Sequence, residues 1–144
     1  MTISRFEDIA AWQDARELTK NVYQCTSRMS FSRDFGLRDQ IQRAAGSVMH
    51  NIAEGFDSGS DVEFVRFLRY AQRSCTEVQS ELYVALDQKY ISDQQFQAHF
   101  DQASKTRSKM AGSLSTSSLR QETNADERPR TRRRRTCLND GYLG

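Results

Sequence analysis

The sequence has few of the features that build a β-sheet protein or a membrane protein. Its 144 residues include one proline and seven glycines, too few for the many tight turns of an all-β fold. No stretch approaches the roughly 18 consecutive apolar residues of a transmembrane helix. The segment Met1–Asp8 also lacks the apolar run of a signal peptide. We therefore expect a cytoplasmic protein of helical class.

Cysteine and histidine are equally scarce. Cys25, Cys75 and Cys137 are odd in number and lack the Cys-x-x-Cys spacing of a zinc or redox site. We expect reduced thiols, with Cys25 and Cys75 as small core residues. Neither His50 nor His99 follows a glutamate by three residues, as a di-metal carboxylate bundle requires. Since Gly-rich phosphate loops and nucleophile elbows are also missing, we predict no cofactor, no metal and no enzyme of these classes.

Four segments carry apolar residues at the three- and four-residue steps of an amphipathic helix. They span roughly residues 7–29, 36–54, 60–87 and 92–114. Ser60 with Glu63, and Ser92 with Gln95, form capping-box patterns that predict where the last two helices begin. The connections between these segments are only a few residues long, and such short connections force neighbouring helices to be antiparallel. The sequence thus predicts an all-α, up-down-up-down four-helix bundle over residues 1–117, with a core that includes Trp12, Leu37, Ile41, Ile52, Phe67, Leu68 and Leu82.

The formal net charge of +2 is unevenly divided. Residues 1–119 contain 14 Lys and Arg against 15 Asp and Glu, whereas residues 120–144 contain 7 against 4. The end of the chain is rich in serine and then in arginine, and it includes Arg132–Arg135. Such a segment buries too little apolar area to offset its ordering entropy, so we predict a disordered arginine-rich tail over residues 118–144. A shifted reading frame near the stop codon would also explain its composition.

One group of residues has a more specific pattern than any helical stripe. Arg43-Ala44-Ala45 is followed by Asn51-Ile52-Ala53-Glu54-Gly55, and Phe67-Leu68 lies in the next helix. With Gly36-Leu37, this pattern resembles the bacterial "four helix bundle protein" family over roughly residues 5–112. The founding members of that family are encoded in intervening sequences of 23S ribosomal RNA genes.

The resemblance implies more than a fold. The family is related to the accessory protein of diversity-generating retroelements, a homopentamer of four-helix protomers that associates with a reverse transcriptase and nucleic acid. By analogy, a homopentamer with an RNA or DNA partner, or with a partner protein, is implied here.

Positive side chains on the second and third predicted helices are the candidate contacts for nucleic acid. They are Arg38, Arg43, Arg66, Arg69 and Arg73. The spacing of the last three puts their guanidinium groups on one helical face, where they could neutralise phosphates. The alternative is an ordinary solvated surface, in which Asp39, Asp61, Glu63 and Glu77 pair with these arginines at helical spacing.

The motif Asn51, Glu54 and Gly55 closes the second predicted helix. Its structural interpretation has Asn51 and Glu54 hydrogen-bonded to adjoining backbone and Gly55 in a left-handed cap position. Its functional interpretation is a subunit contact or a ligand groove.

Arg43 and His50 are seven residues apart and loosely match the motif of HEPN ribonucleases, in which histidine acts as acid and base and arginine stabilises the phosphate. Ala44 departs from that motif, and an exposed histidine on a helix explains His50 equally simply. The leading hypothesis is a non-enzymatic oligomeric scaffold that associates with RNA or with a nucleic-acid-processing protein. A metal-independent ribonuclease and a protein-only adaptor are the alternatives.

Overall fold

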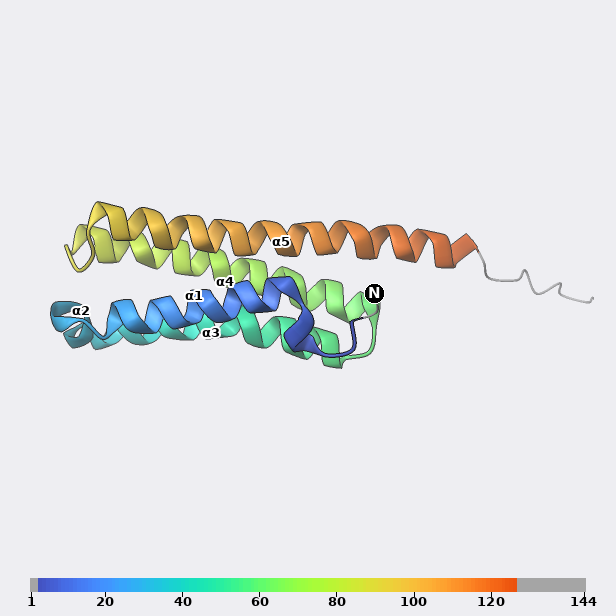
Figure 1. Ribbon diagram of the computed structural model, residues 1–144, viewed down its shortest axis with the longest axis horizontal. Coiled ribbons are helices and arrows are strands. Elements are labelled where there is room, and N and C mark those ends of the chain that lie inside the picture. Colours follow the sequence, from blue (N-terminus) through green and yellow to red (C-terminus); the bar gives the residue numbers. More distant parts are fainter. Residues whose placement is uncertain (1–2, 127–144) are drawn as a thin grey trace, which may run out of the picture.

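The computed structural model describes residues 3–126, with side chains to residue 113, and every regular element in that part of the chain is helical (Figure 1). A short 3₁₀ helix precedes five α-helices. In chain order the elements are η1 (Phe6–Asp8), α1 (Ala10–Thr26), α2 (Met29–Arg33), α3 (Phe35–Asp57), α4 (Asp61–Asp87) and α5 (Asp93–Asp126). The prediction of an all-α protein is confirmed.

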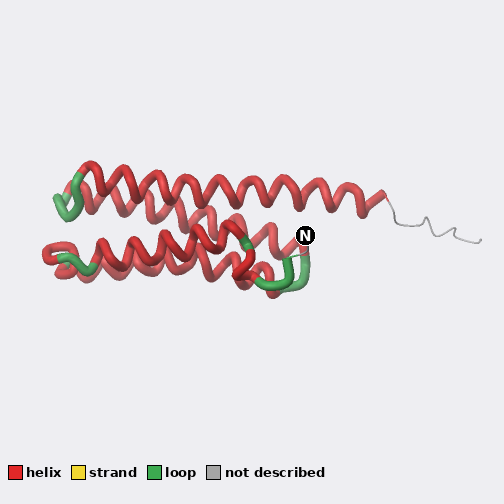
Figure 2. Tube along the Cα trace, in the orientation of Figure 1, coloured by secondary structure: helices red, strands yellow, loops and turns green. Residues whose placement is uncertain are grey.

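The four long helices lie side by side along the length of the molecule. Helices α3, α4 and α5 each contact the long helix before them, and α5 also contacts α1. Figure 2 shows the loops gathered at the two ends, so the chain runs along the long axis and back again. This is the arrangement that short connections predict for successive helices.

Polar side chains cap the starts of α4 and α5. At the start of α5, the Ser92 hydroxyl accepts from the Gln95 amide at 3.1 Å, and the Gln95 side chain accepts from the Ser92 amide at 2.9 Å. At the start of α4, Ser60 accepts from the Glu63 amide at 3.4 Å. The capping box of α5 therefore has both of its hydrogen bonds. In the capping box of α4, the bond accepted by the serine hydroxyl is present.

The core lies between the four long helices. Its largest fully buried side chains include Leu18, Ile41, Ile52, Leu68 and Leu82. Two of the predicted core residues, Trp12 and Phe67, are only half-buried. Trp12 is half-buried and packs against the core, with Phe6 at 5.1 Å between ring centroids. Phe67 is half-buried and is not part of the core cluster; it lies beside Gly55 of α3.

Two segments have more helix than the sequence indicates. Residues 30–35, predicted as a break, include most of α2, whose Phe31 is 1% exposed and stacks on Tyr90 at 5.2 Å. Helix α5 continues to Asp126, so residues 118–126 of the predicted disordered tail are helical. The remaining residues of that predicted tail, 127–144, lie outside the described residues, as does Cys137.

The described helices include none with the length and apolar character needed to cross a membrane.

Candidate nucleic-acid interface

The five predicted arginines do not form one cluster. Arg38 pairs with Asp39 at 3.0 Å, donates to the Ser32 carbonyl and lies 4.8 Å from the centroid of the Phe35 ring. Arg43 donates from Nε to the Asp39 carbonyl at 3.2 Å, one turn earlier in α3. Both guanidinium groups are thus held locally, near the start of α3.

Arg66 is also engaged. Its Nε donates to the Tyr70 hydroxyl at 2.8 Å, and its guanidinium lies 3.7 Å from the Glu63 carboxylate. The hydrogen bond to Tyr70 and the charge of Glu63 raise the pKa of Arg66 above its usual value. The predicted pairing with a carboxylate at helical spacing is therefore found for Arg66, whose partner Glu63 is three residues away, whereas Arg38 pairs with its immediate neighbour Asp39.

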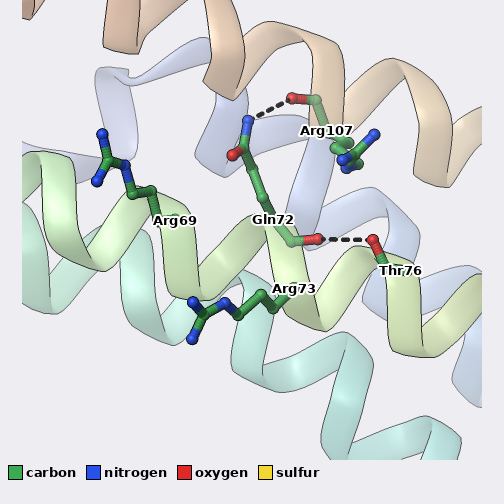
Figure 3. Close-up of a pocket in the computed structure, with 5 residues that line it drawn as sticks. All are labelled: Arg69, Gln72, Arg73, Thr76 and Arg107. Atoms are coloured by element: carbon green, nitrogen blue, oxygen red, sulfur yellow. Dashed lines mark hydrogen bonds between the residues drawn. The ribbon is translucent and has the colours of Figure 1, made fainter.

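Arg69 and Arg73 have a different environment. With Gln72 and Thr76 of α4 and Arg107 of α5, they line a groove of about 310 Å³, shown in Figure 3 and called here the α4–α5 groove. No carboxylate of the described residues lies within ion-pair distance of these three guanidinium groups, and none of the three donates a hydrogen bond within that part of the chain. Arg73 does lie over the Tyr70 ring, 5.9 Å from its centroid. Three exposed positive charges therefore line one groove without neutralisation by the protein.

The groove is held together by side-chain contacts to backbone. The Gln72 amide donates to the Arg107 carbonyl at 3.4 Å and so links α4 to α5. The Thr76 hydroxyl donates to the Gln72 carbonyl at 3.2 Å (Figure 3). Guanidinium groups in such a setting can bind phosphate oxygens with charge-assisted hydrogen bonds.

Arg107 is a site residue that sequence reasoning missed. It lies between the buried Ala103 and Met110 in sequence, so it interrupts the apolar stripe of α5. In the structure Arg107 is exposed on the side of α5 that faces α4. A charged residue inside an apolar stripe is a signal for the edge of a helix interface, where a long side chain reaches solvent.

The Asn51, Glu54 and Gly55 motif is partly as predicted. The Asn51 amide donates to the Ser47 carbonyl at 2.8 Å and to the Ser47 hydroxyl at 3.0 Å, so its bond to adjoining backbone is confirmed. The Glu54 side chain is exposed and has no hydrogen bond or ion pair among the described side chains, which corrects the prediction for that residue.

Gly55 is not a left-handed cap. Helix α3 continues through it to Asp57, and among the described glycines it is Gly59, beyond the end of the helix, that has a positive φ, at 65°. A β-carbon at Gly55 would lie 2.7 Å from Cβ of Phe67 and 3.0 Å from Cδ2 of Phe64. The motif glycine therefore allows α3 and α4 to approach closely, a role that tertiary packing imposes.

The Arg43 and His50 pair is not assembled. The Arg43 side chain is directed back to Asp39. The His50 ring lies beside Gly46, since a β-carbon at Gly46 would be 3.6 and 3.9 Å from its ring atoms. No hydrogen bond joins the two residues in the part of the chain that the structure describes. His50 is exposed on α3, as its simpler interpretation requires.

Glu81 is an ionisable group that the sequence did not single out. Its residue is 8% exposed, and its Oε2 has no hydrogen-bond partner. Burial, together with the charge of Glu77, raises the pKa of Glu81 to about 7, while Arg43 acts in the opposite direction. This carboxyl lies in α4, outside the α4–α5 groove, and contributes no charge to it.

The cysteines have the environment expected of core thiols. Cys25 and Cys75 are buried and unbonded, and burial raises the pKa of both thiols, to about 12 for Cys75. Within the described residues, no group of three or more His, Cys, Asp or Glu side chains is placed to hold a metal ion.

Comparison with known proteins gives the family. Residues 7–112 match the family model of the 23S rRNA-intervening sequence protein. No curated protein matches the sequence. Among solved structures, a protein of unknown function from the S23 ribosomal protein family of Bacteroides thetaiotaomicron has a similar fold, with a TM-score of 0.67 and 18% sequence identity over 73% of this chain and 98% of that chain. Since the family model covers most of the helical region, the chain belongs to the 23S rRNA-intervening sequence protein family.

Proposed function

We propose that the protein is a non-enzymatic helical scaffold that binds RNA through the α4–α5 groove. The observation that carries the proposal is the set of three guanidinium groups, on Arg69, Arg73 and Arg107, that line one groove without a carboxylate partner among the described residues. Contacts of this kind to phosphate supply most of the affinity of sequence-independent nucleic-acid binding. The family description, which names an intervening sequence of a ribosomal RNA, favours RNA as the polyanion.

The rest of the surface supports the choice of this groove. Arg38 and Arg66 are paired with Asp39 and Glu63, and a phosphate would have to displace those carboxylates. The charges of residues 1–119 nearly cancel, so overall attraction of RNA by this part of the chain is weak. Binding thus depends on the arginines without carboxylate partners that line this groove.

The test is RNA binding by a charge-reversal variant with a matched control. The triple variant Arg69→Glu, Arg73→Glu, Arg107→Glu should bind a fluorescein-labelled RNA of about 12 nucleotides more than about tenfold more weakly than wild type, measured by fluorescence anisotropy at low salt. The control Arg16→Glu, Lys20→Glu, Arg33→Glu changes the net charge equally outside the groove. Equal weakening in both variants, or no binding by wild type, would remove the proposed site.

We also propose that the protein forms a homo-oligomer, with five chains as the number that the family resemblance implies. Large apolar side chains at one end of the molecule favour self-association, since Met29 is 80% exposed and Phe35 is 65% exposed. Light scattering of the full chain should give five times the mass of the 144-residue protein. A mass of one chain would contradict the proposal.

The proposal includes no chemistry on the RNA. Labelled RNA incubated with the wild-type protein should remain intact, because Arg43 and His50 share no contact. Cleavage by wild type that is lost in His50→Ala would instead support the ribonuclease alternative.

A further inference from the structure

The two helices that form the α4–α5 groove also carry a group of aromatic rings. Tyr83 of α4 contacts Phe96 and Phe100 of α5, with ring centroids 4.8 and 5.8 Å apart, and the two phenylalanine rings are 5.4 Å apart. We call these three residues the aromatic cluster. Tyr83 is 52% exposed, whereas the two phenylalanines are half-buried against the core.

The groove and the aromatic cluster lie on one strip. On α4, the positions 69, 72, 76, 79 and 83 recur at alternating steps of three and four, which places them on one helical face. Contacts to α5 occur along this strip, since Gln72 donates to the Arg107 carbonyl and Gln79 donates to the Ser104 hydroxyl at 2.7 Å. The arginines thus lie within the α4–α5 seam and the aromatic cluster lies toward the loop that joins the two helices, with Gln79 and Ser104 between them in sequence. Figure 1 shows α4 and α5 running side by side.

The spacing along the strip matches a short length of one nucleic-acid strand. Arg69 and Tyr83 are fourteen residues apart in α4, or about 21 Å along the helix axis. Stacked nucleotides rise about 3.4 Å each along a strand, so this distance spans about six nucleotides. Proteins that bind single strands combine a positively charged groove with aromatic rings on which bases stack.

From this arrangement we infer that the α4–α5 seam binds single-stranded nucleic acid in preference to a duplex, with phosphates at Arg69, Arg73 and Arg107 and a base on Tyr83. The inference rests on the proposed function and specifies its ligand. Bases within a duplex are stacked on each other and offer no free face to Tyr83, whereas an unpaired base does. The half-buried phenylalanines pack against the tyrosine ring in tilted and edge-on geometry.

The test separates stacking from charge. Wild type should bind a labelled single-stranded RNA of about 12 nucleotides more tightly than a duplex of the same length. The variant Tyr83→Ala should weaken binding to the single strand about tenfold and leave duplex binding unchanged. Tyr83→Trp, which retains an aromatic face, should restore single-strand affinity. Because Tyr83 is largely exposed, thermal unfolding should show an intact fold in both variants.

Each remaining outcome has a defined meaning. Single-strand affinity unchanged in Tyr83→Ala would overturn the inference; if the arginine variant still loses binding, the proposed function survives. Failure of wild type to bind either RNA would overturn both. An acidic peptide that binds wild type more tightly than RNA, and is lost in Tyr83→Ala, would assign the strip to a polypeptide partner and overturn the inference.

Discussion

Gly55 lies where α4 packs tightly against α3, and the reason for a glycine there is spatial. The residue is helical and buried, and the nearest atoms to a β-carbon would belong to Phe67 and Phe64 of α4. Gly46, also in α3, is different, because a β-carbon there would meet only the His50 ring, at 3.6 Å or more. Two glycines of one helix therefore have opposite tolerance to a methyl group.

The variant Gly55→Ala should lower the free energy of unfolding by about 1–3 kcal/mol, because a methyl group must force α3 and α4 apart. The matched variant Gly46→Ala should be neutral or stabilising by up to about 1 kcal/mol, since alanine is the better helix former. Urea denaturation of both variants measures the difference. Equal stability of the two would refute the close-approach explanation.

Glu81 should make stability depend on pH. Its pKa is about 7 in the folded protein, above the value of about 4.3 for an unperturbed glutamate. The folded state therefore binds more protons than the unfolded state between these values. The associated stability is fully present below about pH 4.3 and is lost as the pH rises through about 7.

The variant Glu81→Gln keeps the shape of the side chain and removes its titration. We expect it to be more stable than wild type at pH 8, by on the order of 2 kcal/mol, with the difference shrinking toward pH 5. Urea denaturation at several pH values measures this, and Glu54→Gln, at an exposed carboxylate, is the control. The prediction fails if wild type and Glu81→Gln have the same pH dependence.

At the scale of the helix, the two capping boxes differ in completeness. Ser92 and Gln95 satisfy two backbone amides reciprocally, at 3.1 and 2.9 Å. Ser60 satisfies the Glu63 amide at 3.4 Å, near the limit of a hydrogen bond. The start of α5 is thus fixed more firmly by its cap than the start of α4.

Loss of these caps should reflect their geometry. Ser92→Ala should destabilise the protein by about 1 kcal/mol, and Ser60→Ala by less. Ser80→Ala, at an exposed position inside α4, should be neutral or slightly stabilising, because it removes no cap. Thermal unfolding ranks the three variants, and a larger loss in Ser60→Ala would contradict the order of the bond lengths.

At the scale of the whole molecule, RNA binding should depend on salt through a small number of phosphate contacts. Replacing Arg69, Arg73 and Arg107 with glutamine removes three cations. The slope of log K against log salt concentration for a single strand should then fall in magnitude by about 2, at about 0.7 per phosphate contact. Titrations at several salt concentrations measure the slope, and an unchanged slope would show that phosphates bind elsewhere.

The helical fold was predictable because its signals are local. Alternating steps of three and four residues defined the four long helices, and Ser60 and Ser92 marked two of their starts within one residue. Most of the predicted core is buried, as for Ile41, Leu68 and Leu82. The end of α5 was not predictable in this way, because its last part lacks an apolar stripe.

The candidate site was only partly predictable from sequence. Arg69 and Arg73 were identified by their spacing, but Arg38, Arg43 and Arg66 have the same charge and similar spacing. Which of them bond within the bundle depends on Tyr70, Glu63 and Asp39. The sequence did not identify Arg107 or Tyr83, because their place in the site depends on the packing of α5 against α4.

The sequence by itself determined that this protein is helical, where its long helices run and which family it belongs to, because these properties depend on residue order within one segment. Only the tertiary structure decided that Gly55 serves close packing, that Glu81 is buried without a partner, and that three arginines share a groove. Each of these depends on distances between residues of different helices or on burial by them, and the spacing within one helix does not contain that information.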